Sequence, residues 1–214
     1  MCWRGFMGNG MRRKPTLLIF AKEPRRGRVK SRLAREIGAA EALRFYRSNL
    51  TRLHRRLHGQ DGWRTVWCVA PDRAVHRRRA WPRGVTLQPQ GQGDLGQRMA
   101  RALRAAPPGP VMLIGSDIPA IDGAALRQAT SLLRRNDAVF GPAEDGGYWL
   151  VGFRRIRAVP FGLFRGVRWS GPFALGDSIA TLPAGARIGF APVLPDVDDG
   201  PSYRRWKECR NGTC

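Results

Sequence analysis

Short apolar runs alternate along the chain with longer stretches in which apolar residues recur at helical spacing. In 39–58, for example, Leu43, Tyr46, Leu50 and Leu53 would lie on one side of a helix. The apolar runs predict strands at 15–21, 64–70, 84–88, 110–115, 137–141, 147–153 and 186–193. The spaced stretches predict helices near 39–58, 72–80, 94–105, 122–135, 172–182 and 200–209. This alternation is typical of a mostly parallel sheet flanked by helices.

The chain length favours a single domain. With 214 residues and no low-complexity linker, the chain can form one sizeable core. We predict one domain over 15–208, a flexible tail over 209–214, and an arm over 1–14 that is either disordered or an over-extended start. No apolar run reaches the roughly 18 residues of a membrane span, so no membrane span is expected. Since no secretory signal is recognisable, the expected location is cytoplasmic.

The formal net charge of +22 raises the question of a nucleic-acid partner. All but four of the 38 basic residues are Arg, the exceptions being Lys14, Lys22, Lys30 and Lys207. The basic residues are scattered and form no stripe interleaved with aromatic residues, so we expect no specific nucleic-acid partner. A non-catalytic protein, bound to nucleic acid through its charge or kept as a degenerate transferase for a partner, stays open as an alternative.

The four cysteines show no metal-ligand spacing. Cys68 lies inside an apolar run and is predicted to be a core thiol. Cys209 and Cys214 could close a small loop in an oxidising compartment, and Cys2 lies in the predicted arm.

A basic turn follows the first predicted strand. Lys22 directly follows that strand, Gly27 permits a turn, and Lys30 and Arg32 begin a helix, so all three cations would point toward one place. A strand-to-helix turn of this kind presents N–H groups and positive charge to a phosphate. The alternative is a solvated basic loop, which the ordered spacing makes less favourable.

A carboxylate follows the predicted strand 110–115. Asp117 stands between Ser116 and Pro119, beyond the carboxyl end of that strand, where open α/β sheets bind ligands. The alternative role is a helix N-cap, but Asp122 is better placed for that.

Two further acidic clusters stand out. Glu144 and Asp145 precede two glycines, Gly146 and Gly147, and then Tyr148. The glycines would let the backbone approach a ligand closely, and the carboxylates could act as a general base or metal ligand. An Asp-Gly pair also indicates a hairpin turn, and both interpretations can hold together if the hairpin tip forms the acceptor site.

The other acidic cluster lies near the end of the chain. Asp196 and Asp198 alternate on one side of an extended segment, at a spacing that suits one divalent cation. Asp199 is predicted, alternatively, to cap the helix 200–209.

Taken together, five collinear stretches between about 15 and 200 carry a family resemblance. They are 20–33, 93–99, 115–119, 140–152 and 196–198. The chain resembles the bacterial rSAM/selenodomain-associated transferases, small proteins with the nucleotide-diphospho-sugar transferase (GT-A) fold. Its fold is also similar to that of the guanylyltransferases of molybdopterin and deazaflavin cofactor synthesis. The resemblance implies an α/β, Rossmann-like, three-layer αβα protein with a mixed, mostly parallel central sheet.

The resemblance also implies roles for individual residues. Nucleotide and phosphate contacts fall on Lys22, Gly27, Lys30, Arg32, Asp94 and Arg98; the metal ligands on Asp117 and Asp198; the catalytic carboxylates on Asp117, Asp145 and Glu144; and acceptor contacts on Gly146, Gly147 and Tyr148. The chain departs from the family pattern at Ser31, Gln97 and Asp199, and the last of these leaves the metal ligand in question.

These observations lead to an expected function. We expect a Mg²⁺- or Mn²⁺-dependent transferase whose partners are a nucleotide or nucleotide sugar and a small-molecule acceptor, with glycosyl transfer favoured. The alternative enzyme is a nucleotidyltransferase that condenses a nucleoside triphosphate with a phosphorylated small molecule.

Overall fold

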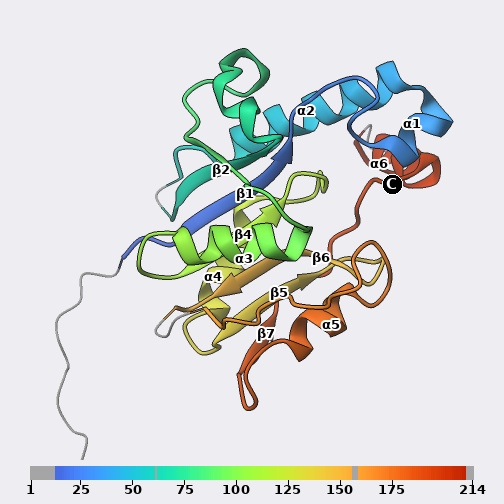
Figure 1. Cartoon of the computed structure of the whole chain (residues 1–214). Helices are drawn as coiled ribbons and strands as arrows, with labels where there is room; N and C mark the ends of the chain where they lie inside the picture. Colours follow the sequence, from blue (N-terminus) through green and yellow to red (C-terminus); the bar gives the residue numbers. More distant parts are fainter. Residues whose placement is uncertain (1–12, 61, 156–158, 211–214) are drawn as a thin grey trace, which may run out of the picture.

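The computed structural model describes residues 13–60, 62–155 and 159–210 (Figure 1). Most of the predicted arm, most of the predicted tail, Cys2 and Cys214 lie outside the described residues. The domain limits and the Cys209–Cys214 pairing therefore remain predictions. Within the described residues, no helix is both long and apolar enough to cross a membrane.

The described residues form one seven-stranded sheet with helices around it. Its strands are β1 (Thr16–Lys22), β2 (Arg64–Ala70), β3 (Leu87–Pro89), β4 (Val111–Gly115), β5 (Ala138–Pro142), β6 (Tyr148–Phe153) and β7 (Ile188–Phe190). The helices are α1 (Ser31–Ile37), α2 (Ala39–Leu57), α3 (Leu95–Ala105), α4 (Gly123–Leu132), α5 (Ala174–Ala180) and α6 (Gly200–Arg210), with 3₁₀ helices η1 (Asp72–His76) and η2 (Arg78–Ala80).

The strand order is β3-β2-β1-β4-β6-β5-β7. β1 lies parallel to both β2 and β4, β2 to β3, and β5 to β7. β6 runs antiparallel to β4 and β5, because a short hairpin joins β5 directly to β6. The sheet is mixed and mostly parallel, as predicted.

Apolar residues on both sides of β1 divide the core into two halves. Leu17 and Ile19 pack in a cluster with α2 and α4, whereas Leu18 and Phe20 pack in a second cluster with α3 and α5. A strand buried on both faces is expected at the centre of a parallel sheet. The helices therefore form layers on either side of the sheet, with α3 in front of it in Figure 1, which confirms the three-layer αβα fold. Cys68 is fully buried, as expected of a core thiol.

A third, smaller apolar cluster attaches α6 to α1 and α2 (Figure 1). Leu33, Phe45 and Tyr203 lie at its centre, and the Tyr203 hydroxyl donates a 2.7 Å hydrogen bond to Glu41. This packing holds the start of α1 beside the chain that enters α6, so two segments far apart in sequence meet at one place.

Three predicted elements differ from the structure. The helix expected over 72–80 is two 3₁₀ turns, because only Ala74 is buried there and no second apolar turn supports an α-helix. The strand expected over 84–88 pairs only over 87–89. The strand expected over 186–193 is limited to 188–190, since Pro192 has no N–H to continue the ladder.

Two predicted helix caps are present. Asp122 accepts a hydrogen bond from the Ala125 N–H at 2.9 Å, and Asp199 accepts one from the Ser202 N–H at 2.9 Å. The carboxylates of Asp122 and Asp199 are therefore occupied with helix N-termini, which separates them from Asp117 and Asp198.

Candidate functional site

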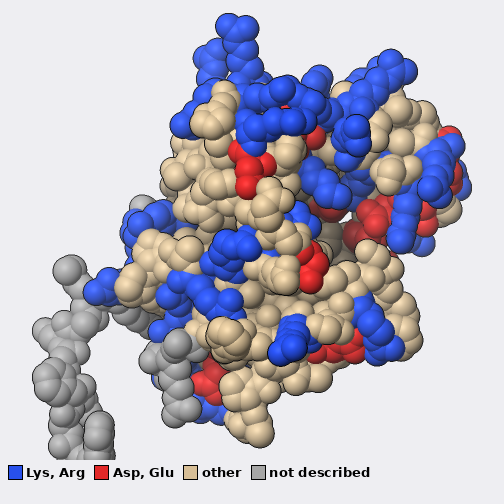
Figure 2. Space-filling model, viewed as in Figure 1, with Lys and Arg blue, Asp and Glu red and all other residues tan. Residues whose placement is uncertain are grey.

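A cleft of about 670 Å³ opens beyond the carboxyl ends of β1 and β4. Its charged lining residues are Lys22, Lys30, Arg32, Arg98, Asp117, Asp145, Asp196 and Asp198. Figure 2 shows acidic side chains in and around a hollow, on a face that is otherwise rich in Lys and Arg. Parallel strands direct their carboxyl ends to one edge of the sheet, which is why segments 22–32 and 115–117 meet here.

Lys30 connects the two carboxylates that the resemblance assigns to a metal. Its Nζ lies 2.7 Å from Asp198 Oδ1 and 3.5 Å from Asp117 Oδ1, and its side chain is 3% exposed. Burial acts to lower the pKa of Lys30, but the charges of Asp117 and Asp198 outweigh it and raise the pKa, so the ammonium is charged. Lys30 also has a positive φ of 48°, which turns the chain sharply into α1.

Side chains from α2 fix the strand ends that carry Lys22 and Asp117. The Tyr46 hydroxyl accepts from Lys22 N at 2.9 Å, donates to Lys22 O at 3.0 Å and lies 3.1 Å from Ser116 Oγ. Asn49 Nδ2 donates to Ser116 O at 2.7 Å. These buried bonds hold the ends of β1 and β4 against one helix, while the Asp117 side chain remains 56% exposed to the cleft.

Acidic groups surround the Lys30 ammonium. Burial, together with the charges of Asp198 and Asp145, raises the pKa of Asp196 to about 6. Asp198 and Asp145 therefore both lie close enough to Asp196 to disfavour its charged form. A position that attracts the Lys30 ammonium is also one that favours a metal cation.

Asp117 and Asp198 could supply two oxygen ligands to a divalent cation. Over the residues that the structure describes, no group of three or more His, Cys, Asp or Glu side chains forms a metal site on its own. Mg²⁺ is commonly held by one or two carboxylates and completed by substrate phosphates and water, so the two-carboxylate donor set fits such an ion.

Arg98 is held at the edge of the cleft by Gln90. The buried Gln90 side chain donates from Nε2 to the carbonyls of Cys68 and Ala21, at 2.9 and 3.3 Å. Its Oε1 accepts from Arg98 Nη1 at 2.8 Å. The sheet edge therefore orients Arg98 through Gln90.

Aromatic rings form another part of the cleft. The rings of Tyr148 and Trp169 meet edge to face with centroids 6.4 Å apart, and both residues line the cleft. The Tyr148 hydroxyl lies 3.1 Å from Ser178 Oγ, and burial raises the Tyr148 pKa, so the phenol stays protonated.

Nine of the predicted site residues line this cleft. They are Lys22, Lys30, Arg32, Arg98, Asp117, Asp145, Gly147, Tyr148 and Asp198. Four others do not line it, namely Gly27, Asp94, Glu144 and Gly146. The roles of all thirteen remain predictions.

Asp94 and Gly146, which do not line the cleft, make contacts within the protein. Asp94 forms a capping box with Gln97 at the start of α3. Gly146 has φ +82°, and an added Cβ would lie 2.5 Å from the backbone of Pro172. The glycine therefore allows the backbone at 146 to pack closely against the backbone at Pro172. The Ala143 N–H donates to Gly147 O at 3.0 Å, which confirms the hairpin interpretation of this segment.

Sequence reasoning missed five residues of the site: Tyr46, Asn49, Gln90, Trp169 and Ser170. Helical spacing predicts Tyr46 only as part of an apolar helix side, and the polar Asn49 on that same side is the signal that points to a further role. Gln90 follows β3 directly, and a position just after a parallel strand is itself a signal for a ligand-binding residue. Trp169 and Ser170 lie in a loop whose position depends on tertiary packing.

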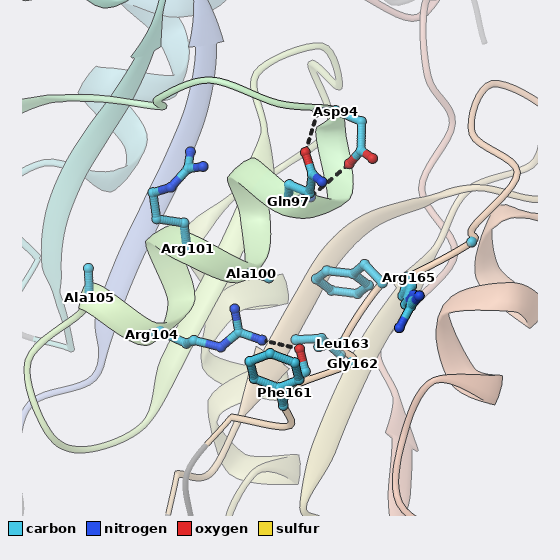
Figure 3. A pocket seen from close by; sticks show the side chains of 12 residues that line it. Asp94, Gln97, Ala100, Arg101, Arg104, Ala105, Phe161, Gly162, Leu163 and Arg165 are labelled. Atoms are coloured by element: carbon cyan, nitrogen blue, oxygen red, sulfur yellow. Dashed lines mark hydrogen bonds between the residues drawn. The ribbon is translucent and has the colours of Figure 1, made fainter.

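A second hollow, of about 820 Å³, lies on another side of α3 between that helix and the 161–166 loop (Figure 3). Arg104 points to the loop and donates to the carbonyls of Pro160 and Phe161, each at 2.7 Å. The one carboxylate among the residues that line this hollow is that of the helix cap Asp94, so the hollow lacks the several carboxylates that line the cleft at the strand ends. The cleft at the strand ends is the candidate site.

The sheet order and this cleft define a transferase of the nucleotide-diphospho-sugar transferase fold. The chain belongs to the family described as "Uncharacterized protein conserved in bacteria (DUF2064)", which matches residues 53–171. A search of curated proteins found no significant match. The assignment to rSAM-associated transferases stays a prediction.

Solved structures support this classification. The chain is 30% identical to a "putative nucleotide-diphospho-sugar transferase" from Desulfovibrio desulfuricans G20, with a TM-score of 0.79 over 86% of this chain and 82% of that one. CMP:2-keto-3-deoxy-manno-octonic acid synthetase complexed with CTP shares the fold at 11% identity, with a TM-score of 0.58 over 94% and 100% of the two chains. Rv0371c from Mycobacterium tuberculosis H37Rv, in complex with manganese, shares it at 18% identity, with a TM-score of 0.52 over 90% and 97%.

Proposed function

We propose that this protein is a metal-dependent transferase that uses a nucleotide-activated donor, and that it transfers the glycosyl group of a nucleotide sugar to a small acceptor. One observation carries the proposal: the cleft beyond the ends of β1 and β4 contains four cations together with the carboxylates Asp117 and Asp198. The similarity to the Desulfovibrio protein supports the donor class.

The cations would bind the donor diphosphate. Lys22 and Arg32 flank the basic turn, and Arg98 is oriented toward the cleft by Gln90. Charge fixed in place before the reaction stabilises negative charge on a leaving group without reorganisation. These three residues would therefore bind the donor and stabilise the departing nucleoside diphosphate.

Asp117 and Asp198 would hold Mg²⁺ or Mn²⁺ together with the donor phosphates. The bound ion would neutralise charge on the diphosphate as it departs. The manganese complex of Rv0371c supports metal use in this fold. Lys30 would have to leave one or both carboxylates as the ion binds, which would free its ammonium for a phosphate oxygen.

Asp145 is the best-placed candidate for general base, because it lines the cleft whereas Glu144 does not. Its carboxylate would take the proton of an acceptor hydroxyl. The acceptor oxygen then forms a bond to the anomeric carbon, and the bond between that carbon and the phosphate oxygen breaks. Gly147 and Tyr148 would contact the acceptor at the same end of the cleft.

Nucleotidyl transfer is the second candidate. The synthetase complexed with CTP shares the fold along nearly the whole chain, which supports it. In that reaction a nucleoside triphosphate would be attacked at its α-phosphorus, and pyrophosphate would be released.

Two measurements separate these candidates. A thermal-shift panel of nucleotides and nucleotide sugars, with and without Mn²⁺, identifies the donor, and a ligand at ~100 times its Kd stabilises the fold by roughly 2.7 kcal/mol. Product analysis then distinguishes release of nucleoside diphosphate, which we expect, from release of pyrophosphate, which would favour nucleotidyl transfer. No response to any nucleotide would contradict both.

A further inference from the structure

A buried amide on α2 occupies a position that suits an apolar residue. Asn49 is 3% exposed and lies on the same side of α2 as Leu50 and Leu53, which belong to the core. Asn has a lower helix propensity than Leu, and an amide in an apolar core costs free energy unless it is hydrogen-bonded. Helix formation and core packing would both favour Leu at position 49, so the reason for an amide there lies in what it binds.

The amide of Asn49 binds the carbonyl that precedes Asp117. Its Nδ2 donates to Ser116 O at 2.7 Å. Because a peptide unit is planar, the same hydrogen bond fixes the direction of the Asp117 N–H. The carbonyl of Asp117 itself accepts a 3.4 Å hydrogen bond from Lys30 Nζ. The two peptide units on either side of the Asp117 Cα are thus bound by Asn49 and by Lys30, respectively.

These two hydrogen bonds would respond differently to a metal ion. The Lys30 ammonium lies 2.7 Å from Asp198 Oδ1 and 3.5 Å from Asp117 Oδ1, the oxygens that a divalent cation would take. A cation bound there would displace the ammonium and, with it, the hydrogen bond to the Asp117 carbonyl. Asn49 is buried and binds a different carbonyl, so its hydrogen bond would remain.

We propose, on the basis of the metal use proposed above, that Asn49 is a positioning residue for the metal ligand: it keeps Asp117 in place after Lys30 has left. The Asp117 side chain is 56% exposed, so its direction depends on how firmly the backbone beneath it is held. A ligand that is already oriented loses less conformational freedom when the ion binds. Loss of the Asn49 hydrogen bond should therefore weaken metal binding and leave the metal-independent nucleotide contacts in place.

Titration calorimetry of Asn49→Leu tests this role. UDP, CDP and GDP are each titrated into the variant and the wild-type protein, with and without Mn²⁺. We expect the strengthening of nucleotide binding by Mn²⁺ to fall about 10- to 100-fold in the variant, the usual effect of removing a group that orients a metal ligand. The affinity for nucleotide without Mn²⁺ should stay close to its wild-type value.

Arg56→Met is the matched control on the same helix. Arg56 Nη1 donates to the carbonyls of Pro119 and Ile121, at 2.8 and 3.4 Å, in the same segment but beyond Asp117. Its loss should loosen this segment and leave the Mn²⁺ effect at its wild-type size. Should Asn49→Leu prove unfolded in urea denaturation, Asn49→Ala takes its place, because water can satisfy the Ser116 carbonyl there without fixing its direction.

A double-mutant cycle separates positioning from a general structural role. If Asn49 acts through Asp117, adding Asn49→Leu to Asp117→Asn causes no further loss of nucleotide affinity in Mn²⁺, because residues that act as one unit are not additive. An undiminished Mn²⁺ effect in Asn49→Leu, equal weakening with and without Mn²⁺, or a further loss in the double variant would each overturn the positioning role. Absence of any Mn²⁺ effect in the wild-type protein would instead refute the proposed metal use, and the role of Asn49 with it.

Discussion

At the scale of single residues, Lys30 has the most informative position. Its ammonium bridges Asp117 and Asp198, the two carboxylates that we propose as metal ligands. A divalent cation and the ammonium therefore compete for the same oxygens. Metal binding would release Lys30 toward the donor phosphates, so that metal and donor assist each other's binding.

Substitution Lys30→Met tests this competition. We expect the variant to bind Mn²⁺ alone more tightly, because the competing ammonium is gone. Its affinity for nucleotide should fall roughly 10- to 100-fold, since a charge-assisted hydrogen bond contributes about 1.5–3 kcal/mol. Titration calorimetry measures both affinities.

Lys207→Met is the matched control, because it removes an equal charge from α6, outside the cleft lining. It should change neither affinity. Weaker binding of Mn²⁺ alone by Lys30→Met would show that the ammonium does not compete with the metal.

At the scale of elements, α2 positions the site through hydrogen bonds. Tyr46→Phe removes the hydroxyl that bonds both backbone groups of Lys22 and contacts Ser116. We expect the free energy of unfolding to fall by ~1–3 kcal/mol, because buried polar groups lose their partner. Urea denaturation provides the value.

Tyr203→Phe is the comparison, since it removes one hydroxyl that donates to the half-buried Glu41. The free energy of unfolding should fall less in Tyr203→Phe than in Tyr46→Phe. Equal stability of Tyr46→Phe and the wild-type protein would show that the network does not secure the strand ends.

The hairpin between β5 and β6 depends on a close contact at Gly146. In Gly146→Ala the new methyl group would lie 2.5 Å from both Cα and O of Pro172, at a backbone φ of +82° that disfavours side chains. We expect a loss of ~1–3 kcal/mol in thermal or urea unfolding. Gly176→Ala serves as the control, because nothing lies within 4 Å of its Cβ position on α5. If Gly146→Ala is as stable as Gly176→Ala, the close contact between residue 146 and Pro172 is contradicted.

The elements show what periodicity can and cannot predict. Apolar runs located β1, β4, β5 and β6 closely, because a strand buried on both faces must be apolar throughout, whereas the partly exposed β3 and β7 are shorter than predicted. Strand and helix limits were less accurate where proline or exposed arginines decide them, as at Pro192. Contacts between distant segments, such as that between Lys30 and Asp198, depend on tertiary packing. The alternation of residues 196–198 predicts that Asp198 faces a cation. Nothing in this local pattern indicates that the cation is the ammonium of Lys30.

At the scale of the whole molecule, the net charge of +22 is spread over a surface rich in Lys and Arg, as Figure 2 shows for one face. The cleft, where carboxylates stand beside basic residues, interrupts this surface. Scattered charge attracts polyanions without specificity. Such binding weakens steeply as the salt concentration rises, because the release of counterions then gains less free energy.

Nucleic-acid binding should therefore be weak and sensitive to salt. We expect affinity for a DNA or RNA duplex, measured by fluorescence anisotropy, to drop more than roughly tenfold between about 50 and 200 mM salt. Nucleotide binding in the cleft should persist over that range, because partly buried charges are screened less. Tight duplex binding at physiological salt, together with no response to nucleotides, would favour the non-catalytic alternative.

In the proposed site, the cleft binds a nucleotide through a metal held by Asp117. The decisive measurement is titration calorimetry of the donor nucleotide with and without Mn²⁺, on the wild-type protein and on Asp117→Asn. Asp122→Asn is the control, because Asn caps a helix as well as Asp and the same charge is removed a few residues away.

We predict that Mn²⁺ strengthens nucleotide binding in the wild-type protein and in Asp122→Asn, and has no effect in Asp117→Asn. Urea denaturation should show that Asp117→Asn remains folded with nearly unchanged stability, since its side chain is 56% exposed and Lys30 keeps its 2.7 Å ion pair with Asp198. If Asp117→Asn binds nucleotide and Mn²⁺ as the wild-type protein does, or if it unfolds, Asp117 is not the metal ligand and the proposed site is contradicted.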